Sequence, residues 1–113
     1  MNCTSLAEVH IPHGVTSIGT QAFSGCSSLA KVRIPKGVTS ISTFAFYGCS
    51  SLATVHIPHG VTSIGEYAFE NCSSLTEISV PEGAAVGQGA FHRCSGLSSS
   101  RLAELEARYP WRW

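Results

Sequence analysis

The feature that most constrains the fold is an internal repeat with a period of about 23 residues, and periods of this size are typical of solenoids. Three successive units of equal length cover 6–28, 29–51 and 52–74, and a fourth unit, one residue shorter, covers 75–96. The first and third units differ at only five positions. A unit this short cannot enclose a core of its own, so each copy must bury its apolar residues against neighbouring copies. The sequence therefore predicts a repeat solenoid, in which equivalent residues of successive units stack in columns.

Each unit contains the signals of two short strands. The opening pattern Leu-x-x-Val-x-Ile comprises Leu6, Val9 and Ile11 in the first unit, and we expect all three side chains to point into the core. A Pro-x-Gly turn follows, and the next segment, Val-Thr-Ser-Ile, predicts a short second strand. A single helical turn is expected after it, ending at a residue that tolerates a left-handed backbone. The residues at that position are Gly25, Gly48, Asn71 and, breaking the pattern, Arg93.

Two further columns follow from the repeat. Phenylalanine forms one, at Phe23, Phe46, Phe69 and Phe91, and cysteine forms the other, at Cys3, Cys26, Cys49, Cys72 and Cys94. Parallel side chains on coils about 4.7–4.9 Å apart hold their Cβ atoms beyond the usual disulfide range. There is no Cys-x-x-Cys pair, and a line of thiols does not suit tetrahedral zinc. We therefore expect buried, reduced thiols, with disulfides and a metal site as less favoured alternatives.

The C-terminal residues 98–113 abandon the repeat and predict a capping helix and tail, so the chain divides into a solenoid over 1–97 and this cap. Ser98 to Ser100 offer helix N-caps, and Pro110 ends the run. Leu102, Leu105 and Tyr109 recur at helical spacing, and we expect Trp111 and Trp113 to fold over the last coil. A frayed extension from outside the repeat is the alternative. At the other end only five residues precede Leu6, which leaves the first coil uncapped and open to homodimer formation.

The repeat phrase, which combines Ile-Pro, Gly-Val-Thr-Ser-Ile, Ala-Phe and Gly-Cys-Ser-Ser-Leu at fixed offsets, resembles the BspA-like class of leucine-rich repeats. The resemblance covers residues 3–97. It implies a curved solenoid whose Leu-x-x-Val-x-Ile strands form a parallel sheet on the concave side. In that family such arrays occur mainly in large surface or secreted proteins that act in adhesion and protein binding.

The outward columns of the first strand supply the candidate binding surface. With the resemblance, they predict a non-enzymatic module that binds a protein or peptide on the concave sheet. The candidate residues are Glu8, His10, Lys31, Arg33, Thr54, His56, Glu77 and Ser79. The alternative is a purely structural repeat scaffold, or a fragment of a larger surface protein, with no ligand of its own.

Histidines give this surface a sequence-level pH hypothesis. His10, Arg33 and His56 share one column, which becomes uniformly cationic as the pH falls past about 6.5 and would then favour an acidic partner. His10 and His56 are two coils apart, roughly 9–10 Å, and cannot easily share a zinc ion. His13 and His59 lie in the turn that follows the strand. A solvated surface without a ligand is the alternative.

Composition and motifs exclude several classes of function. Seven basic and seven acidic residues give no net charge, so neither nucleic acid nor an anionic membrane is an expected partner. No apolar run is long enough to span a membrane and the N-terminus lacks the features of a signal peptide, so the localisation is left open.

Catalysis is not expected, because a repeat delivers the same group to many points, whereas a catalytic site needs different groups at one point. No catalytic residue, cofactor or metal ligand is predicted. Asn2-Cys3-Thr4 and Asn71-Cys72-Ser73 match the glycosylation pattern, and we interpret both matches as by-products of the repeat.

Overall fold

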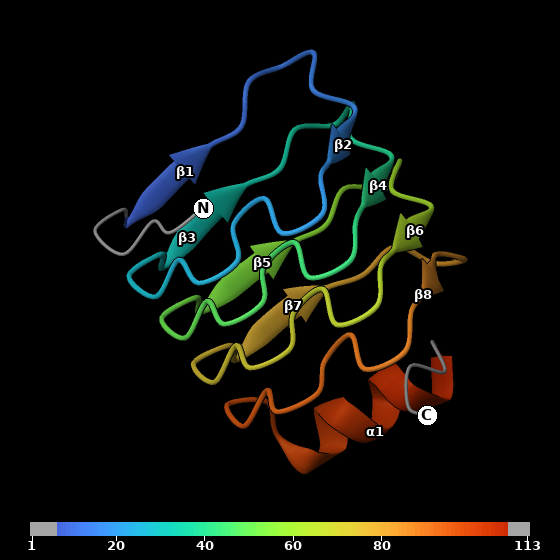
Figure 1. Cartoon of the computed structure of the whole chain (residues 1–113). Coiled ribbons are helices and arrows are strands. Elements are labelled where there is room, and N and C mark those ends of the chain that lie inside the picture. Colours follow the sequence, from blue (N-terminus) through green and yellow to red (C-terminus); the bar gives the residue numbers. More distant parts are fainter. Residues whose placement is uncertain (1–6, 109–113) are drawn as a thin grey trace.

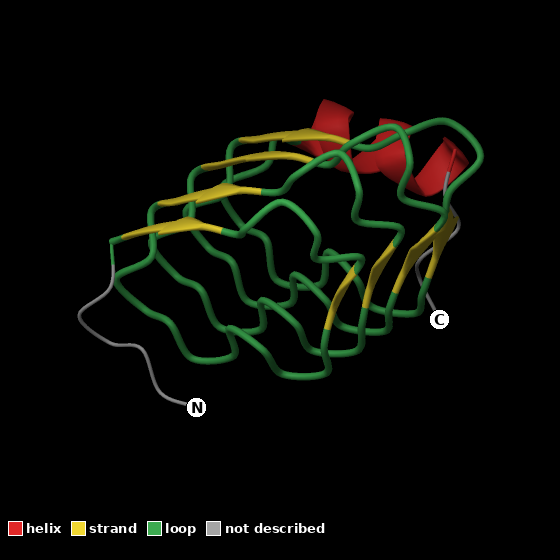
Figure 2. Ribbon diagram, turned by 90° about the horizontal axis from the view of Figure 1, so that it is seen from above, coloured by secondary structure: helices red, strands yellow, loops and turns green. Residues whose placement is uncertain are grey.

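The protein is a stack of short coils, each of which contributes one strand to each of two parallel sheets. In the computed structural model, which describes residues 7–108, the strand orders are β1-β3-β5-β7 in the first sheet (sheet A) and β2-β4-β6-β8 in the second (sheet B). Sheet A contains β1 (Glu8–His10), β3 (Lys31–Arg33), β5 (Thr54–His56) and β7 (Glu77–Ser79). Sheet B contains β2 (Ser17–Ile18), β4 (Ser40–Ile41), β6 (Ser63–Ile64) and β8 (Ala85–Val86), and one helix, α1 (Ser99–Arg108), follows. The predicted parallel solenoid is confirmed (Figures 1 and 2).

Strand pairing keeps the register of the repeat. Glu8 pairs with Lys31 in sheet A, which is an offset of one full unit. Ser63 pairs with Ala85 in sheet B, and this offset is one residue shorter than a full unit, so the residue that the fourth unit lacks is missing before β8. After β8 the sequence offset stays one residue shorter than a full unit, but equivalent residues still stack in space, as Phe91 does on Phe69.

The segment after each second strand differs from the sequence-based expectation of a single helical turn. It consists of β-turns in which successive N–H groups donate alternately to a carbonyl of the same coil and to a carbonyl of the next coil. The N–H of Phe46 donates to the carbonyl of Ala68 in the next coil at 2.8 Å, whereas the N–H of Tyr47 donates to the carbonyl of Phe44 at 3.1 Å. Phe44 itself has a φ of 59°, outside the right-handed helical region. Half of the N–H groups of this segment thus strengthen the stacking of coils, which a helix, bonded along its own axis, could not do.

The left-handed position that ends this segment is occupied in every coil. Its φ is 77° at Gly25, 74° at Gly48, 67° at Asn71 and 63° at Arg93. Arginine therefore adopts the same conformation as glycine, although its Cβ makes this conformation unfavourable by roughly 1–2 kcal/mol. The repeat geometry overrides the preference of the residue.

Replacing Arg93 with glycine should stabilise the protein by about 0.5–1 kcal/mol. The change relieves the left-handed strain, and the greater freedom of glycine in the unfolded chain offsets part of the gain. Urea denaturation followed by circular dichroism measures the difference. Gln88→Gly is the matched control, because Gln88 is exposed in the same coil without a positive φ, and this change should destabilise. An Arg93→Gly protein less stable than the wild type would contradict the prediction.

The core is built from the columns that the sequence predicts. Leu29, Leu52 and Leu75 have no exposed surface, and Phe46 and Phe69 are equally buried. The phenylalanine rings form a continuous stack with centroids 5.2, 5.3 and 6.0 Å apart along the chain from the first to the fourth coil. These separations lie in the range of favourable aromatic pairs. The phenylalanine column is therefore a main stabilising feature of the solenoid.

The cysteine column lies beside the phenylalanine column, and its described members are buried and form no disulfide: Cys26, Cys49, Cys72 and Cys94. The Sγ of Cys72 donates to the carbonyl of Phe46 in the previous coil at 3.3 Å, and Cys94 repeats the contact with Phe69 at 3.1 Å. Burial raises the pKa of the Cys72 thiol far above its ordinary value and raises the pKa of Cys94 to about 12. The thiols of Cys72 and Cys94 thus act as neutral hydrogen-bond donors between coils.

Alkaline conditions should destabilise the protein through these thiols. Folding raises the pKa of the Cys94 thiol, so this thiol ionises at a lower pH in the unfolded chain than in the folded protein. Its contribution to the free energy of unfolding is therefore constant below pH 9 and is lost as the pH rises from 9 toward about 12. We expect a loss of about 1.4 kcal/mol per pH unit from Cys94. Urea titrations between pH 8 and 11 measure the slope, and Cys94→Ala should reduce it. An unchanged slope in that variant would contradict this role.

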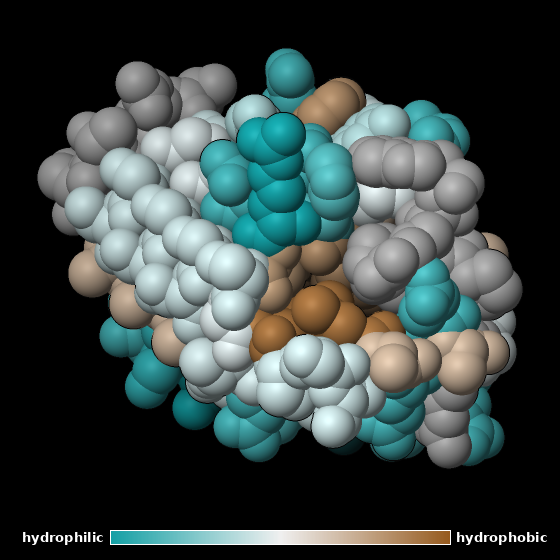
Figure 3. All heavy atoms as spheres, turned by 90° about the horizontal axis from the view of Figure 1, so that it is seen from below, coloured by the Kyte–Doolittle hydropathy of each residue, from teal (hydrophilic) through white to brown (hydrophobic). Residues whose placement is uncertain are grey.

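The last coil is covered by α1, as the sequence predicts. The hydroxyl of Ser98 accepts a hydrogen bond from the N–H of Arg101 at 3.1 Å, which is the geometry of an N-cap. Leu105 is 1% exposed, and the guanidinium of Arg101 donates to the carbonyl of Ile78 in the edge strand β7. Figure 3 shows the molecule from the end at which α1 lies, where polar groups border an apolar area.

Several predictions fall outside the described residues. They concern the start of the chain, with Cys3, Leu6, the first glycosylation pattern and the uncapped first coil, and the end, with Tyr109, Pro110, Trp111 and Trp113. Within 7–108, no helix is long and apolar enough to cross a bilayer.

Candidate functional site

All eight candidate binding residues lie on the four strands of sheet A, at the two positions that flank the central inward residue. In β3, for example, Val32 is 6% exposed, whereas Lys31 and Arg33 on either side are exposed. The register places Glu8 beside Lys31 and His10 beside Arg33. The alternation of the strand thus presents two columns of variable side chains on one face.

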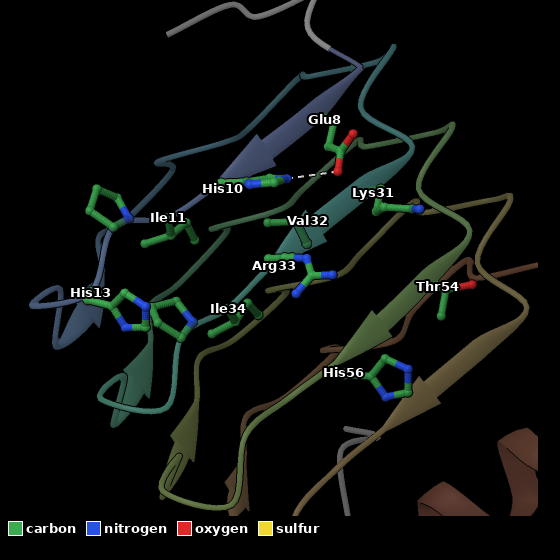
Figure 4. Close-up of a pocket in the computed structure, with 12 residues that line it drawn as sticks. Glu8, His10, Ile11, His13, Lys31, Val32, Arg33, Ile34, Thr54 and His56 are labelled. Atoms are coloured by element: carbon green, nitrogen blue, oxygen red, sulfur yellow. Dashed lines mark hydrogen bonds and ion pairs between the residues drawn. The ribbon is translucent and has the colours of Figure 1, made fainter.

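Six of these eight side chains surround one open hollow of about 1000 Å³. The hollow lies over β1, β3 and β5 and the turns that follow β1 and β3, as Figure 4 shows. Its lining residues are Glu8, His10, Ile11, Pro12, His13, Lys31, Val32, Arg33, Ile34, Pro35, Thr54 and His56. Glu77 and Ser79, on β7, are not among them. The structure therefore brings together the candidates of the first three coils and leaves those of the fourth aside.

An apolar strip in this hollow was missed by the sequence reasoning. Ile11 and Ile34 were expected to point into the core, but both are only partly buried and line the hollow together with Pro12 and Pro35. Ile57, the equivalent residue of the third coil, is 5% exposed, as predicted for the whole column. The repeat pattern alone gives these isoleucines one environment, so it contains no signal for this difference between coils.

The hollow contains one carboxylate, which is held by its neighbours. His10 Nε2 lies 2.8 Å from the Glu8 Oε2 atom, and the two side chains are 66% and 51% exposed. The hydrogen bond to His10, assisted by the charges of Lys31 and Arg33, lowers the pKa of Glu8 below its ordinary value. Glu8 is therefore anionic at neutral pH and offsets part of the positive charge around it.

The sheet beneath the hollow is paired least where β3 meets β5. Pairing there is limited to Lys31 with Thr54, whereas the pairs β1–β3 and β5–β7 each extend over three residues. On the far side, His56 Nδ1 lies 3.2 Å from the hydroxyl of Ser79, which links β5 to β7. Arg33 thus lines the hollow from β3, which has a fully paired neighbour in β1 and a partly paired one in β5.

The described residues contain no group of three or more potential metal ligands from His, Cys, Asp and Glu. His10 and His56 come from strands separated by β3. Apart from the Glu8 carboxylate, the ionisable groups that line the hollow are guanidinium, ammonium and imidazole groups, and they lie beside an apolar strip. Such a surface can bind anionic and apolar groups side by side.

The sequence and the structure are both similar to those of known leucine-rich repeat proteins. The sequence matches the BspA-type leucine-rich repeat region, in six copies, over residues 1–106. A leucine-rich repeat protein of T. pallidum is 38% identical with a TM-score of 0.83, and the match covers 86% of this chain and 46% of that one. A leucine-rich repeat protein of Bacteroides ovatus is 31% identical with a TM-score of 0.82, covering 95% of this chain and 29% of that one.

A third structure carries a more specific description. A leucine-rich cell surface protein of Faecalibacterium prausnitzii is 31% identical with a TM-score of 0.71, and the match covers 85% of this chain and 35% of that one. The chain thus spans less than half the length of each of these structures. No curated protein matches it. Because the family model matches almost the whole chain and the fold agrees, this chain belongs to the BspA-type leucine-rich repeat family.

Proposed function

We propose that the protein is a non-enzymatic binding module that holds a protein or peptide segment in the hollow on sheet A. The observation that carries this proposal is the contrast between the two kinds of column. Inward columns repeat apolar residues of the same kind in coil after coil, whereas the outward columns of β1, β3 and β5 change in charge between coils, as in Glu8, Lys31 and Thr54, and line a hollow of about 1000 Å³. Leucine-rich repeats of this family are typical scaffolds for protein interaction, which supports the proposal.

A role at a bacterial cell surface, in adhesion, is the setting that we propose for this binding. It rests on the printed description of one similar structure as a cell surface protein. The chain matches only a part of each similar structure, so a longer array could extend the same face beyond the coils described here.

A selection from a phage-displayed peptide library tests the binding proposal. Thr54→Trp places a bulky ring inside the hollow, and Ser63→Trp is the matched control, because Ser63 is exposed on β6 in sheet B. Peptides enriched on the wild type should bind the Ser63→Trp variant equally and lose binding to Thr54→Trp. Circular dichroism establishes that both variants are folded.

Two outcomes would overturn the proposal in favour of a structural scaffold without a ligand. One is a selection in which no peptide is enriched over repeated rounds. The other is a set of peptides that binds Thr54→Trp as tightly as it binds the wild type.

A further inference from the structure

We propose that the preferred occupant of the hollow is a peptide segment in which carboxylate side chains flank an apolar one, and that it binds more tightly at pH 5.5 than at pH 7.5. This inference rests on the proposed function and specifies its ligand. Three features of the hollow carry it: the charge of its lining, the arrangement of that charge around an apolar strip, and the presence of three imidazoles.

The charge of the lining favours an anion. Lys31 and Arg33 contribute two positive charges from β3, and Glu8 on β1 contributes the single negative charge, which leaves one net positive charge before any histidine is protonated. Among the described residues, the guanidinium of Arg33 makes no hydrogen bond or ion pair. Its donors are therefore available to a carboxylate, which guanidinium binds through two parallel hydrogen bonds.

The apolar strip favours a peptide over a uniform polyanion. Ile11 and Ile34 line the hollow beside Arg33, so a bound anionic group brings its neighbours onto an apolar surface. An apolar side chain between two carboxylates gains from burial there. A sulfated polysaccharide has no such side chain, and its closely spaced charges would meet the Glu8 carboxylate.

The imidazoles make the charge dependent on pH. His10 on β1, His13 in the following turn and His56 on β5 all line the hollow, and histidine is the residue type whose charge responds to pH near neutrality. Full protonation raises the net charge of the lining from one to four.

The charged groups around the hollow, outside its lining, are few and of both signs. Lys36 lies in the turn after β3, next to the lining residue Pro35, His59 lies in the turn after β5, and Glu77 lies on β7, one coil beyond Thr54. Carboxylates of the peptide stay ionised at pH 5.5, since their ordinary pKa lies near 4. The attraction therefore grows as the pH falls through this range.

Fluorescence anisotropy with synthetic peptides tests the proposal. The probes are labelled peptides in which two glutamates flank a leucine at several spacings, and the controls carry glutamine instead of glutamate. Binding is measured at pH 7.5, 6.5 and 5.5 at constant ionic strength, on the wild type and on four variants. Three variants are single substitutions: Arg33→Gln, Lys36→Gln and His59→Gln. The fourth variant combines His10→Gln, His13→Gln and His56→Gln.

We expect the glutamate peptides to bind about tenfold more tightly at pH 5.5 than at pH 7.5, and the glutamine peptides to bind weakly at both. Arg33→Gln should weaken binding by about fivefold or more at both pH values, whereas Lys36→Gln, with the same change in net charge, should change it less than twofold. The triple histidine variant should lose the pH dependence and keep the affinity at pH 7.5, and His59→Gln should keep both.

The following results would overturn this inference. They are equal binding of glutamate and glutamine peptides, a flat pH profile of the wild type, and equal effects of Arg33→Gln and Lys36→Gln. Tighter binding of labelled heparin than of any peptide, with the same sensitivity to Arg33→Gln, would reassign the hollow to a sulfated polysaccharide. Peptides from the phage selection that need an open hollow but contain no acidic residue would uphold the proposed function and overturn this inference alone.

Discussion

Replacing Phe69 with alanine should lower the free energy of unfolding by about 3–5 kcal/mol. The ring has no exposed surface and lies between two others, with centroids 5.3 Å from Phe46 and 6.0 Å from Phe91. Its loss removes the buried apolar area and both ring contacts, and it leaves a cavity at the centre of a solenoid with few coils. Because small domains are stable by only about 5–15 kcal/mol, this variant should be near the limit of folding at 25 °C.

Phe23→Ala is the matched control for this prediction. Phe23 is only partly buried and stacks on one ring, that of Phe46, at 5.2 Å. Its replacement should therefore destabilise clearly less than that of Phe69. Urea denaturation followed by circular dichroism gives both values. Equal losses at the two positions, or a loss at Phe69 well below the range expected for a buried ring, would show that the column does not carry the stability assigned to it.

Replacing Leu105 with alanine should lower the free energy of unfolding by about 2–5 kcal/mol and promote association between molecules. Leu105 is 1% exposed and belongs to the same core as Ile78 and Leu97 of the last coil. Weakening the contact between α1 and this coil exposes the apolar end of the solenoid and the edge of β7, whose Ile78 carbonyl is otherwise held by Arg101.

Two measurements check this prediction together. Urea denaturation gives the change in stability, and size-exclusion chromatography with light scattering gives the mass in solution as concentration rises. Leu102→Ala is the control, because Leu102 is only partly buried and should have a smaller effect on both. A Leu105→Ala variant as stable and as monodisperse as the wild type would show that α1 does not cap the solenoid.

Much of the fold could be predicted because the repeat translates directly into columns. The constant offset between Leu29, Leu52 and Leu75 requires equivalent residues to stack, and their complete burial confirms it. The turn segment was predicted less well. Its residues have ordinary helical propensity, but Phe44 and Tyr67 adopt positive φ values, because alternate N–H groups bond to the next coil. That partner exists only in the assembled solenoid, so no local pattern indicates it.

The candidate site was predictable in its outline and not in its extent. Strand alternation identifies which residues of β1, β3 and β5 face outward, but it treats all four coils alike. The limits of the hollow depend on how much of the Ile11 and Ile34 side chains is buried. The stacking of the turns decides which residues lie next to these two side chains. Sequence spacing does not contain that information.

Both the core and the hollow depend on the stacking of coils in register. The most direct test is a nuclear Overhauser spectrum of the protein in solution with isotope-labelled phenylalanine rings, assigned by single Phe→Leu changes. The structure predicts cross-peaks between the rings of Phe46 and Phe69 and between those of Phe69 and Phe91, whose centroids are 5.3 and 6.0 Å apart, with none between Phe46 and Phe91. Absence of the two neighbouring cross-peaks, or a strong one between Phe46 and Phe91, would contradict it.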